Sequence, residues 1–375
     1  MRKSSTLFVG LDVHKDSIDI ATCTAARDAK PEHLGTIGGG LEPVTKALRR
    51  QVSRGQRLHI VYEAGPCGFV LQRHLAALGW HCEVIAPSSI VKAPGERVKT
   101  DRRDAIKLAR LASQGLLTAV RVPDRGDEAV RDVVRAREDA VREQRCARQR
   151  LKALLLRNGI VYVGRSSWTA AHLRWIARLK LPETAQQLAF QEYLHAITEA
   201  SARIARLEQA LRDLLPDWPL APVVAALQAL RGVQLIAAIT LTAEIQDFWR
   251  FASPRHLMAY LGLVPGEHTS GPRRRLGAIT KAGNSPARRI LVEIAQHYDQ
   301  PARVSPIIAR RHTNLSKAVT DIAWSAQVRL CARFRRLGAR RLLRNKIVVA
   351  IARELCGFVW AIAREVSVPA QPMQQ

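Results

Sequence analysis

Four acidic residues stand at the ends of predicted strands or at the start of a predicted helix. Asp12 follows the apolar segment Leu7–Leu11, and Glu63 closes a second apolar segment. Asp101 and Asp104 are three residues apart, so they share one face of the helix predicted to begin there. Carboxylate oxygens suit Mg²⁺ or Mn²⁺, and two such ions can clamp both oxygens of an in-line phosphoryl displacement. The four residues therefore predict a divalent-metal site.

Each of these carboxylates also has an ordinary structural explanation. Asp101 is a suitable N-cap, and Asp104 suits the first helical turn because negative charge there complements the helix dipole. Glu63 could be a surface acid at a strand end, and Asp12 could form a turn before His14. However, both helix acids extend the apolar stripe that should pack on the sheet, whereas a solvated pair would lie opposite it. The combination favours the metal site.

A hydroxyl pair beside a basic segment forms the second candidate site. Ser270 follows Thr269, and residues 271–290 hold six Lys or Arg and no acid. A serine hydroxyl is a weak nucleophile until a base or metal activates it, and the neighbouring Glu267 and His268 are poor candidates for that base. The basic side chains would hold phosphates and spread transition-state charge. They are Arg273, Arg274, Arg275, Lys281, Arg288 and Arg289.

Ser270 and its basic neighbours also have ordinary structural explanations. Ser270 could be a turn residue before Gly271, and the arginines could form a solvated surface loop. Gly277, Gly283 and Asn284 argue against the solvated loop, because glycine allows the backbone to approach a ligand closely.

The elements that would position the acids alternate between strand and helix. The pattern begins with strands and continues with strand–helix pairs, which is typical of a mixed sheet with helices on its faces. We therefore expect an α/β domain over residues 1–122. The predicted strands cover residues 7–11, 17–24, 33–37, 58–64 and 81–86, and the predicted helices cover residues 41–52, 69–78 and 101–117.

The rest of the chain is predicted to be mostly helical. Its middle carries the pattern of a helical hairpin with imperfect heptads, which favours a coiled coil. Prolines at 216, 219 and 222 mark a boundary. The predicted domains are a helical or coiled-coil dimerisation region at 123–220, a C-terminal domain carrying Ser270 at 221–364 and a disordered tail at 365–375.

Composition indicates the class of partner. The 375 residues carry a formal net charge of +27, which favours a polyanion, with nucleic acid first and an anionic membrane surface as the alternative. No run of about 18 apolar residues exists to span a bilayer.

The six cysteines are scattered without a Cys-x-x-Cys pair, which argues against a disulfide framework or a zinc site and favours a cytoplasmic protein. The seven tryptophans are expected in cores or helix interfaces, with stacking on bases as the alternative.

Several segments resemble one family of DNA recombinases. FVGLDVHKDSIDIA, VYEAGPCGFVLQRHLAALG and VKTDRRDAIKLARL are similar to the N-terminal DEDD domain of insertion-sequence-110 family transposases, which are relatives of the Piv-type DNA invertases. Residues 251–295 resemble the same family's C-terminal domain through Gly262–Pro265, Ser270–Gly271 and Gly277–Asn284. The resemblance implies a RuvC-like, ribonuclease-H-type N-terminal fold. It also implies an acidic tetrad of Asp12, Glu63, Asp101 and Asp104.

The resemblance further implies a mechanism and partners. Ser270 matches the serine that attacks a DNA phosphodiester and becomes transiently linked to the strand, with Mg²⁺ or Mn²⁺ at the tetrad. This chain has Thr-Ser-Gly where many members show Ser-Ser-Gly, so Thr269 is the second candidate nucleophile and Ser285 the third. The implied partners are double-stranded DNA of the element ends and target, a structured guide RNA, and further copies of the chain in a homodimer or homotetramer.

Two other functions stay open at this point. A metal-dependent DNA junction nuclease would use the same acids with water as the nucleophile and would leave Ser270 without a chemical role. A non-catalytic nucleic-acid packaging protein would explain the charge but not the acids.

Overall fold

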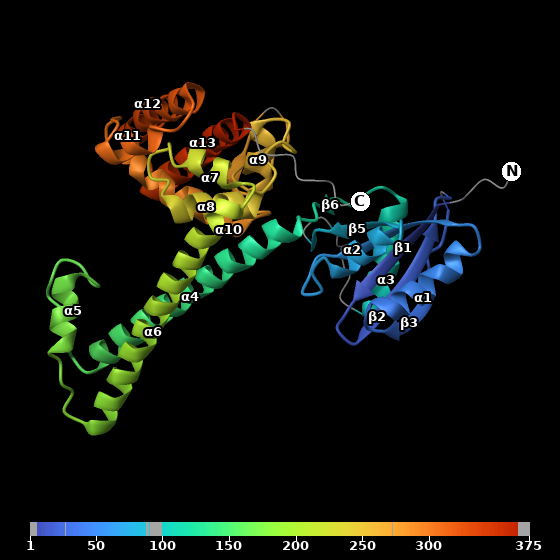
Figure 1. Ribbon diagram of the computed structural model, residues 1–375, viewed down its shortest axis with the longest axis horizontal. Coiled ribbons are helices and arrows are strands. Elements are labelled where there is room, and N and C mark those ends of the chain that lie inside the picture. The colour runs from blue at the N-terminus through green and yellow to red at the C-terminus, as the bar shows by residue number, and fades with distance from the viewer. Residues whose placement is uncertain (1–5, 27, 88–89, 91–99, 272, 367–375) are drawn as a thin grey trace. The chain divides into compact units, whose positions relative to one another are not determined.

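The chain folds into two compact units, residues 1–123 and residues 124–375 (Figure 1). The computed structural model describes residues 6–26, 28–87, 90, 100–271 and 273–366. The first unit is built on a β-sheet, and the second is almost entirely helical. Most of the predicted tail, from residue 367 on, lies outside the described residues.

The N-terminal unit contains a six-stranded sheet in the order β3-β2-β1-β4-β5-β6. The pairs β1–β4 and β4–β5 are parallel, and the other three pairs are antiparallel. The predicted mixed sheet is confirmed, and the short edge strand β6 adds to it. The strands are β1 (Thr6–Val13), β2 (Ser17–Thr24), β3 (Glu32–Gly38), β4 (Arg57–Glu63), β5 (His81–Ile85) and β6 (Ala119–Val120).

Helices cover both faces of this sheet, because alternate side chains of each strand point to opposite faces. Leu11 on β1 and Tyr62 on β4 are buried with α1 (Leu41–Val52) and α2 (Val70–Ala77). The opposite face packs on α3 (Asp101–Ser113). α3 ends earlier than predicted because the chain turns at Gly115, whose φ is +66°.

Gly10 allows α3 to lie directly against β1. A Cβ atom at this position would lie 2.3 Å from the carbonyl oxygen of Ala105 and 2.5 Å from the amide nitrogen of Ala109. Only glycine permits this approach of helix backbone to strand backbone. Because Gly10 lies two residues before Asp12, the close packing also brings the start of α3 beside the end of β1.

The second unit begins with a hairpin of two long helices. α4 (Arg125–Arg157) and α6 (Thr184–Leu214) pack along each other, and α5 (Ala170–Ala177) lies near the end where they are connected (Figure 1). The predicted hairpin is confirmed. The first turns of α6 bury Phe190 in a core shared with α4 and α5.

Most of the remaining helices share one core. Val134 of α4 belongs to the same core, so the hairpin is anchored there. Within the described part of the chain, no helix is long and apolar enough to cross a membrane. The helices are α7 (Ala221–Leu227), α8 (Leu235–Ile245), α9 (Pro254–Tyr260), α10 (Ser285–Ala295), α11 (Pro306–His312), α12 (Lys317–Ala339) and α13 (Arg344–Arg364). Within the shared core, α13 packs on α7, α9, α10 and α12.

Candidate functional site

The end of β1 and the first turn of α3 bring three acids together. The negative charges of Asp104 and Asp101 both act on the carboxyl group of Asp12. His14 joins them, with its Nε2 3.4 Å from Asp12 Oδ2 and 3.7 Å from Asp101 Oδ1. Thr100 caps α3 by accepting a hydrogen bond from the backbone N–H of Arg103. Since Thr100 provides the cap, the N-cap explanation for Asp101 is wrong, and its carboxylate points to the cluster.

Glu63 reaches the same edge of the sheet through strand register. Leu11 of β1 pairs with Tyr62 of the parallel strand β4, so Asp12 and Glu63 are the next residues along two neighbouring strands. Leu11 and Tyr62 face α1 and α2, and the following residues therefore face α3. All four acids thus lie at one edge of the sheet and on the same face.

The electrostatics of Asp12 fit a bound cation. Burial raises the pKa of the Asp12 carboxyl; nearby His14 lowers it, and the charges of Asp104 and Asp101 raise it further. Apart from the long 3.4 Å contact with His14 Nε2, the buried Oδ2 atom of Asp12 has no hydrogen-bond partner among the described residues. A divalent ion would supply that partner and offset the repulsion among the carboxylates. The donor set of hard oxygens fits Mg²⁺ or Mn²⁺.

His14 was not predicted as a site residue. It lies two positions after Asp12, and residues i and i+2 of a strand point to the same face. That spacing was the available signal. The sequence alone did not show that the chain keeps this direction beyond Val13, where β1 ends.

Ser270 lies in the connection of a short β-hairpin, a feature that the helical prediction missed. β7 (Pro265–Glu267) pairs with β8 (Leu276–Ile279), and Ser270 forms an isolated bridge with Arg273. The Thr269 hydroxyl donates to Glu267 Oε1 at 2.8 Å. The Ser270 side chain is exposed, and within the described ranges its hydroxyl has no hydrogen-bond partner. The geometry therefore favours Ser270 over Thr269 as a reactive hydroxyl.

Glu267 is occupied by other groups. Arg274 donates to both of its carboxylate oxygens, at 3.1 and 3.0 Å. The hydrogen bonds from Arg274 and Thr269 hold the pKa of Glu267 below its usual value. A lower pKa makes this carboxylate a weaker general base, in line with the expectation that Glu267 is a poor candidate to activate Ser270.

The six predicted phosphate-binding residues differ in what they contact. Arg273, Arg275 and Lys281 have exposed side chains, as does Arg274. Arg288 donates to the carbonyl oxygens of Leu261 and Ala282, and Arg289 pairs with Glu293 and Glu138. Arg288 and Arg289 therefore support the frame around the hairpin, and Arg274 is paired with Glu267. Arg273, Arg275 and Lys281 are the better candidates for phosphate contacts.

The glycines around the hairpin serve internal packing. A Cβ at Gly283 would lie 2.0 Å from the Tyr260 carbonyl oxygen, and one at Gly262 would lie 2.2 Å from the Ala282 carbonyl oxygen. Asn284 caps α10 and donates to the buried Glu244 at 2.7 Å. The close backbone approach inferred from Gly283 is therefore real, but its partner is the protein's own chain.

Comparison with known proteins decides the family. Residues 9–158 match the DEDD transposase model of the IS110 group, and residues 224–311 match the model described as Transposase IS116/IS110/IS902 family. The chain is 45% identical to "Putative transposase y4qE" of Sinorhizobium fredii, over 96% of this chain and 88% of that protein. The chain belongs to the IS110 family of transposases. This transposase is also 29% identical to the transposase for insertion sequence element IS1533 of Leptospira borgpetersenii, over 89% of this chain and 97% of the relative.

The family places the transposase among enzymes that act on DNA and confirms the resemblance found in the sequence. Its DEDD domain suggests dependence on a divalent metal, in agreement with the acidic cluster.

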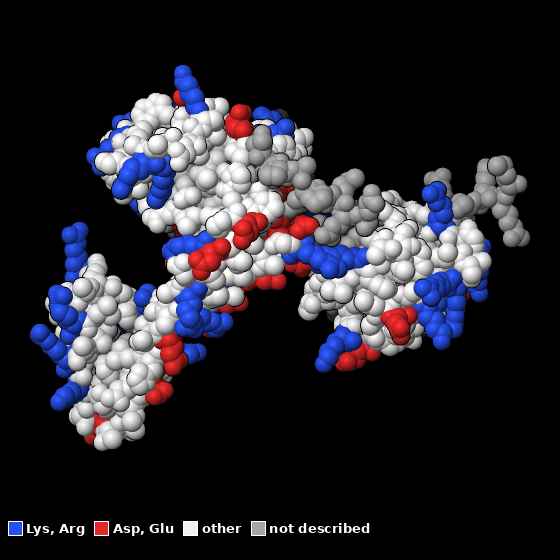
Figure 2. Space-filling model, in the orientation of Figure 1, with Lys and Arg blue, Asp and Glu red and all other residues white. Residues whose placement is uncertain are grey.

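The transposase has a second concentration of positive charge at the end of its helical hairpin. Residues 144–182, which we call the hairpin tip, contain nine Lys or Arg and no acid. Figure 2 shows Lys and Arg side chains around this end and acidic side chains along the shaft of α4 and α6. The tip was predicted only as part of a dimerisation region.

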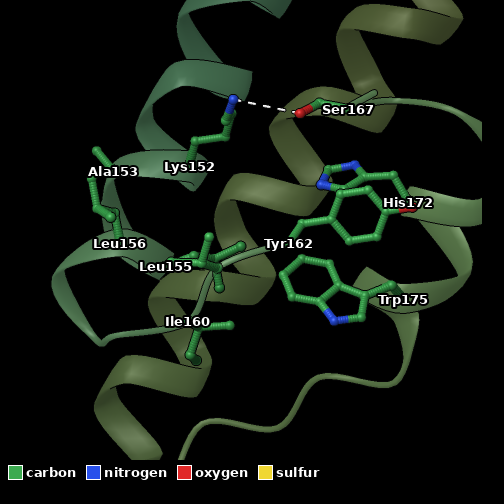
Figure 3. A pocket seen from close by; sticks show the side chains of 10 residues that line it. Lys152, Ala153, Leu155, Leu156, Ile160, Tyr162, Ser167, His172 and Trp175 are labelled. Atoms are coloured by element: carbon green, nitrogen blue, oxygen red, sulfur yellow. Dashed lines mark hydrogen bonds between the residues drawn. The ribbon is translucent and has the colours of Figure 1, made fainter. Parts of the chain in front are cut away.

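The hairpin tip also contains an aromatic cavity of about 390 Å³ (Figure 3). The His172 ring stacks on Trp175 at 5.5 Å, and Tyr162 lies 4.6 Å from His172. The Nζ atom of Lys152 lies at the rim, 3.5 Å from the Ser167 hydroxyl. Burial and the charge of Lys152 lower the pKa of His172, so its ring is neutral at physiological pH. Flat rings beside a cation suit a nucleobase and its phosphate.

Proposed function

We propose that this transposase cuts and rejoins DNA through a covalent phosphoserine at Ser270, assisted by Mg²⁺ held by Asp12, Glu63, Asp101 and Asp104. The observation that carries the proposal is the exposed Ser270 hydroxyl, without a partner among the described residues, in a hairpin that also bears Arg273, Arg274 and Arg275. The sheet order and the acids at one edge of the sheet support a ribonuclease-H-like N-terminal fold.

The covalent step exchanges one phosphodiester for another. The Oγ atom of Ser270 forms a bond to phosphorus while the bond to a sugar oxygen breaks, and the serine proton passes to that leaving oxygen. Because a phosphodiester is kept, the reverse reaction with a new DNA end needs no nucleotide cofactor. The exposed arginines bind the phosphate oxygens and spread the charge that develops on them. A metal ion at the acids supplies neutralisation of that charge and activation of the hydroxyl.

The proposed catalytic groups are divided between the two units of the chain. The acids belong to the unit of residues 1–123, and Ser270 belongs to the unit of residues 124–375. Recombination also joins more than two DNA ends, which requires more than one catalytic serine. We infer that the working enzyme is a homodimer or homotetramer in which the acids of one copy act with the serine of another.

Guidance by a structured RNA is the second part of the proposal. No base-reading motif for duplex DNA stands out in the sequence, so base pairing would supply recognition. The hairpin tip supports this idea, because nine basic residues without an acid and an aromatic cavity suit unpaired nucleotides. Stacking contributes about 1–3 kcal/mol per base.

Trapping the protein–DNA adduct tests the serine chemistry. Duplex DNA carrying an element end is incubated with the enzyme and Mg²⁺, and covalent complexes are separated under denaturing conditions. We expect an adduct with the wild type and with Thr269→Ala, and none with Ser270→Ala. Cleaved DNA without any adduct would show that the enzyme is a junction nuclease that uses water.

RNA binding tests the role of the hairpin tip. The probe is RNA transcribed from the noncoding DNA beside the element, with a blunt DNA duplex as the comparison. Tyr162→Leu and Lys152→Gln should each weaken RNA binding about tenfold, the value of one lost stacking or phosphate contact, and leave duplex binding unchanged. Arg206→Gln is the matched control, because Arg206 is exposed on the shaft of α6 outside the tip. Equal losses in Lys152→Gln and Arg206→Gln, with none in Tyr162→Leu, would mean that RNA binding depends only on positive charge and not on the cavity of the tip.

A further inference from the structure

We propose that His59, His81 and Glu83 form a second metal site, separate from the acidic tetrad, that binds Zn²⁺ or a similar first-row transition metal. One potential ligand atom from each of the three side chains lies within 4.8 Å of the other two. The proposed transposition chemistry does not use these residues.

The sheet itself brings the three side chains together. β4 and β5 are parallel neighbours, with His59 paired to His81 and Val61 paired to Glu83. The alternation of side chains puts His59, His81 and Glu83 on one face of the sheet. Because the strand ladder fixes the positions of all three, little conformational entropy is lost when they bind an ion.

The imidazole rings are held with their Nε2 atoms toward the carboxylate. His59 Nε2 lies 3.0 Å from Glu83 Oε2, and His81 Nε2 lies 3.4 Å from Glu83 Oε1. The two rings meet edge to face at 4.5 Å, and Phe8 packs on His59 at 5.2 Å. These contacts orient the ligand atoms before any ion binds.

The spacing matches a tetrahedral ion. Zn²⁺ binds imidazole nitrogen and carboxylate oxygen at about 2.0–2.1 Å, so neighbouring ligand atoms of a tetrahedron are about 3.3 Å apart. The contacts to Glu83 are near that value, at 3.0 Å from His59 and 3.4 Å from His81, but they run to different oxygens of the carboxylate, so Glu83 would bind an ion through both oxygens or turn to present one. The side chain of His81 is 60% exposed and those of His59 and Glu83 are 26% and 32% exposed, so an ion can enter from solvent. A fourth position is left for water.

The ligand types distinguish this site from the tetrad. Two imidazoles and one carboxylate select Zn²⁺, Co²⁺ or Ni²⁺, whereas Mg²⁺ prefers oxygen ligands alone. His59 is four residues before Glu63 on β4, which is about 13 Å along a strand. One ion cannot serve both groups. The absence of cysteine pairs argued against a zinc site in the sequence, but ligands from two paired strands leave no short motif.

Cobalt binding tests the proposal on the full-length protein. The protein is treated with a chelator, supplied with excess Mg²⁺ to fill the tetrad, and titrated with Co²⁺. We expect the visible absorption of one four-coordinate Co²⁺ per chain, which Zn²⁺ then abolishes by displacement. His59→Ala, His81→Gln and Glu83→Gln should each weaken Co²⁺ binding at least about tenfold. Loss of a residue that only hydrogen-bonds to a metal ligand already weakens metal binding by about that factor, and loss of the ligand itself should weaken it at least as much.

Two control variants make the result specific. His195→Ala removes an exposed histidine that has only Glu192 beside it, so Co²⁺ binding should not change. Asp101→Asn weakens the tetrad and should also leave Co²⁺ binding intact. Absence of the cobalt spectrum in the wild type would overturn the proposal, as would its persistence in the folded His81→Gln protein. Loss of the spectrum in Asp101→Asn would assign the cobalt to the tetrad instead.

Discussion

The ionised carboxylate of Asp12 is needed for the proposed metal site, but it destabilises the metal-free protein. Burial and the charges of Asp104 and Asp101 raise the pKa of Asp12 above its ordinary value of 3.8, although His14 opposes them. A carboxyl whose folded pKa is raised favours the fold while it is protonated. That contribution is fully present below pH 3.8 and is lost as the pH rises through the raised pKa. At neutral pH, the ionised Asp12 therefore opposes folding of the metal-free protein.

Asp12→Asn should stabilise the metal-free protein at neutral pH and abolish strand transfer. The amide removes a buried charge but cannot serve as the same metal ligand. Urea unfolding of both proteins in chelator, from acidic to neutral pH, measures the effect. The stability difference should grow with pH in favour of the variant. A variant that is less stable than the wild type at neutral pH would contradict the electrostatic account.

Residue spacing predicted some of the contacts but not others. The positions of Asp12 and Asp101 followed from strand ends and helix periodicity, and the structure brings the two together. Arg288 looked like a phosphate ligand because it lies in an acid-free segment, yet it binds the carbonyl oxygen of Leu261. Such a contact depends on how distant backbone segments fold back, and local spacing does not contain that information.

Among the elements, the packing of α3 on β1 is what positions the tetrad. Gly10→Ala should push α3 outward, because the new Cβ would overlap the Ala105 carbonyl oxygen and the Ala109 amide. Overpacking of this kind costs about 1–3 kcal/mol. Mg²⁺ binding should weaken as well, since the start of α3 carries two of the acids. The rise in melting temperature on addition of Mg²⁺ measures this binding.

Gly38→Ala is the matched control for that change. Gly38 lies on β3 of the same sheet, and a Cβ there would have nothing within 4 Å. The Gly38→Ala substitution should therefore leave the affinity for Mg²⁺ unchanged from that of the wild type. Equal losses of Mg²⁺ binding in the two variants would mean that α3 packing does not set the metal site.

A second element-scale contact ties the hairpin to the C-terminal helices. Glu244 of α8 is buried, accepts two hydrogen bonds from Arg135 of α4, and accepts another from Asn284. Glu244→Ala removes the carboxylate that both partners bind, and because the Arg135 side chain is half exposed, it should cost about 1.5–3 kcal/mol of unfolding free energy. Glu143→Ala breaks an exposed pair with Arg203 and should cost less than about 1 kcal/mol. Denaturant titration compares the two, and similar losses would contradict a structural role for Glu244.

At the level of elements, periodicity was informative where segments were long or strongly apolar. It predicted the first five strands and the helical hairpin. It missed the β7–β8 hairpin, because β7 has three residues and β8 four, which is too short for alternation to appear. The strands are held by their position beside α9 and α10, which local sequence does not reveal.

For the whole molecule, the proposal that the acids of one copy act with the serine of another predicts complementation between inactive copies. Asp101→Asn and Ser270→Ala each abolish the adduct alone. When the two proteins are mixed and allowed to exchange subunits, the adduct should reappear, because one copy supplies the acids and the other the serine. Adduct formation is measured on the same element-end duplex. Failure of the mixed protein to react, with exchange shown independently, would place the acids and serine of one copy together.

The most direct measurement of the central claim is peptide mapping of the trapped complex. The wild-type adduct formed with Mg²⁺ is digested with protease and nuclease, and mass spectrometry locates the attached nucleotide. We predict a nucleotide phosphate on Ser270, with no adduct in protein carrying Asp12→Asn. A nucleotide on any other residue, or an undiminished adduct without Asp12, would contradict the account.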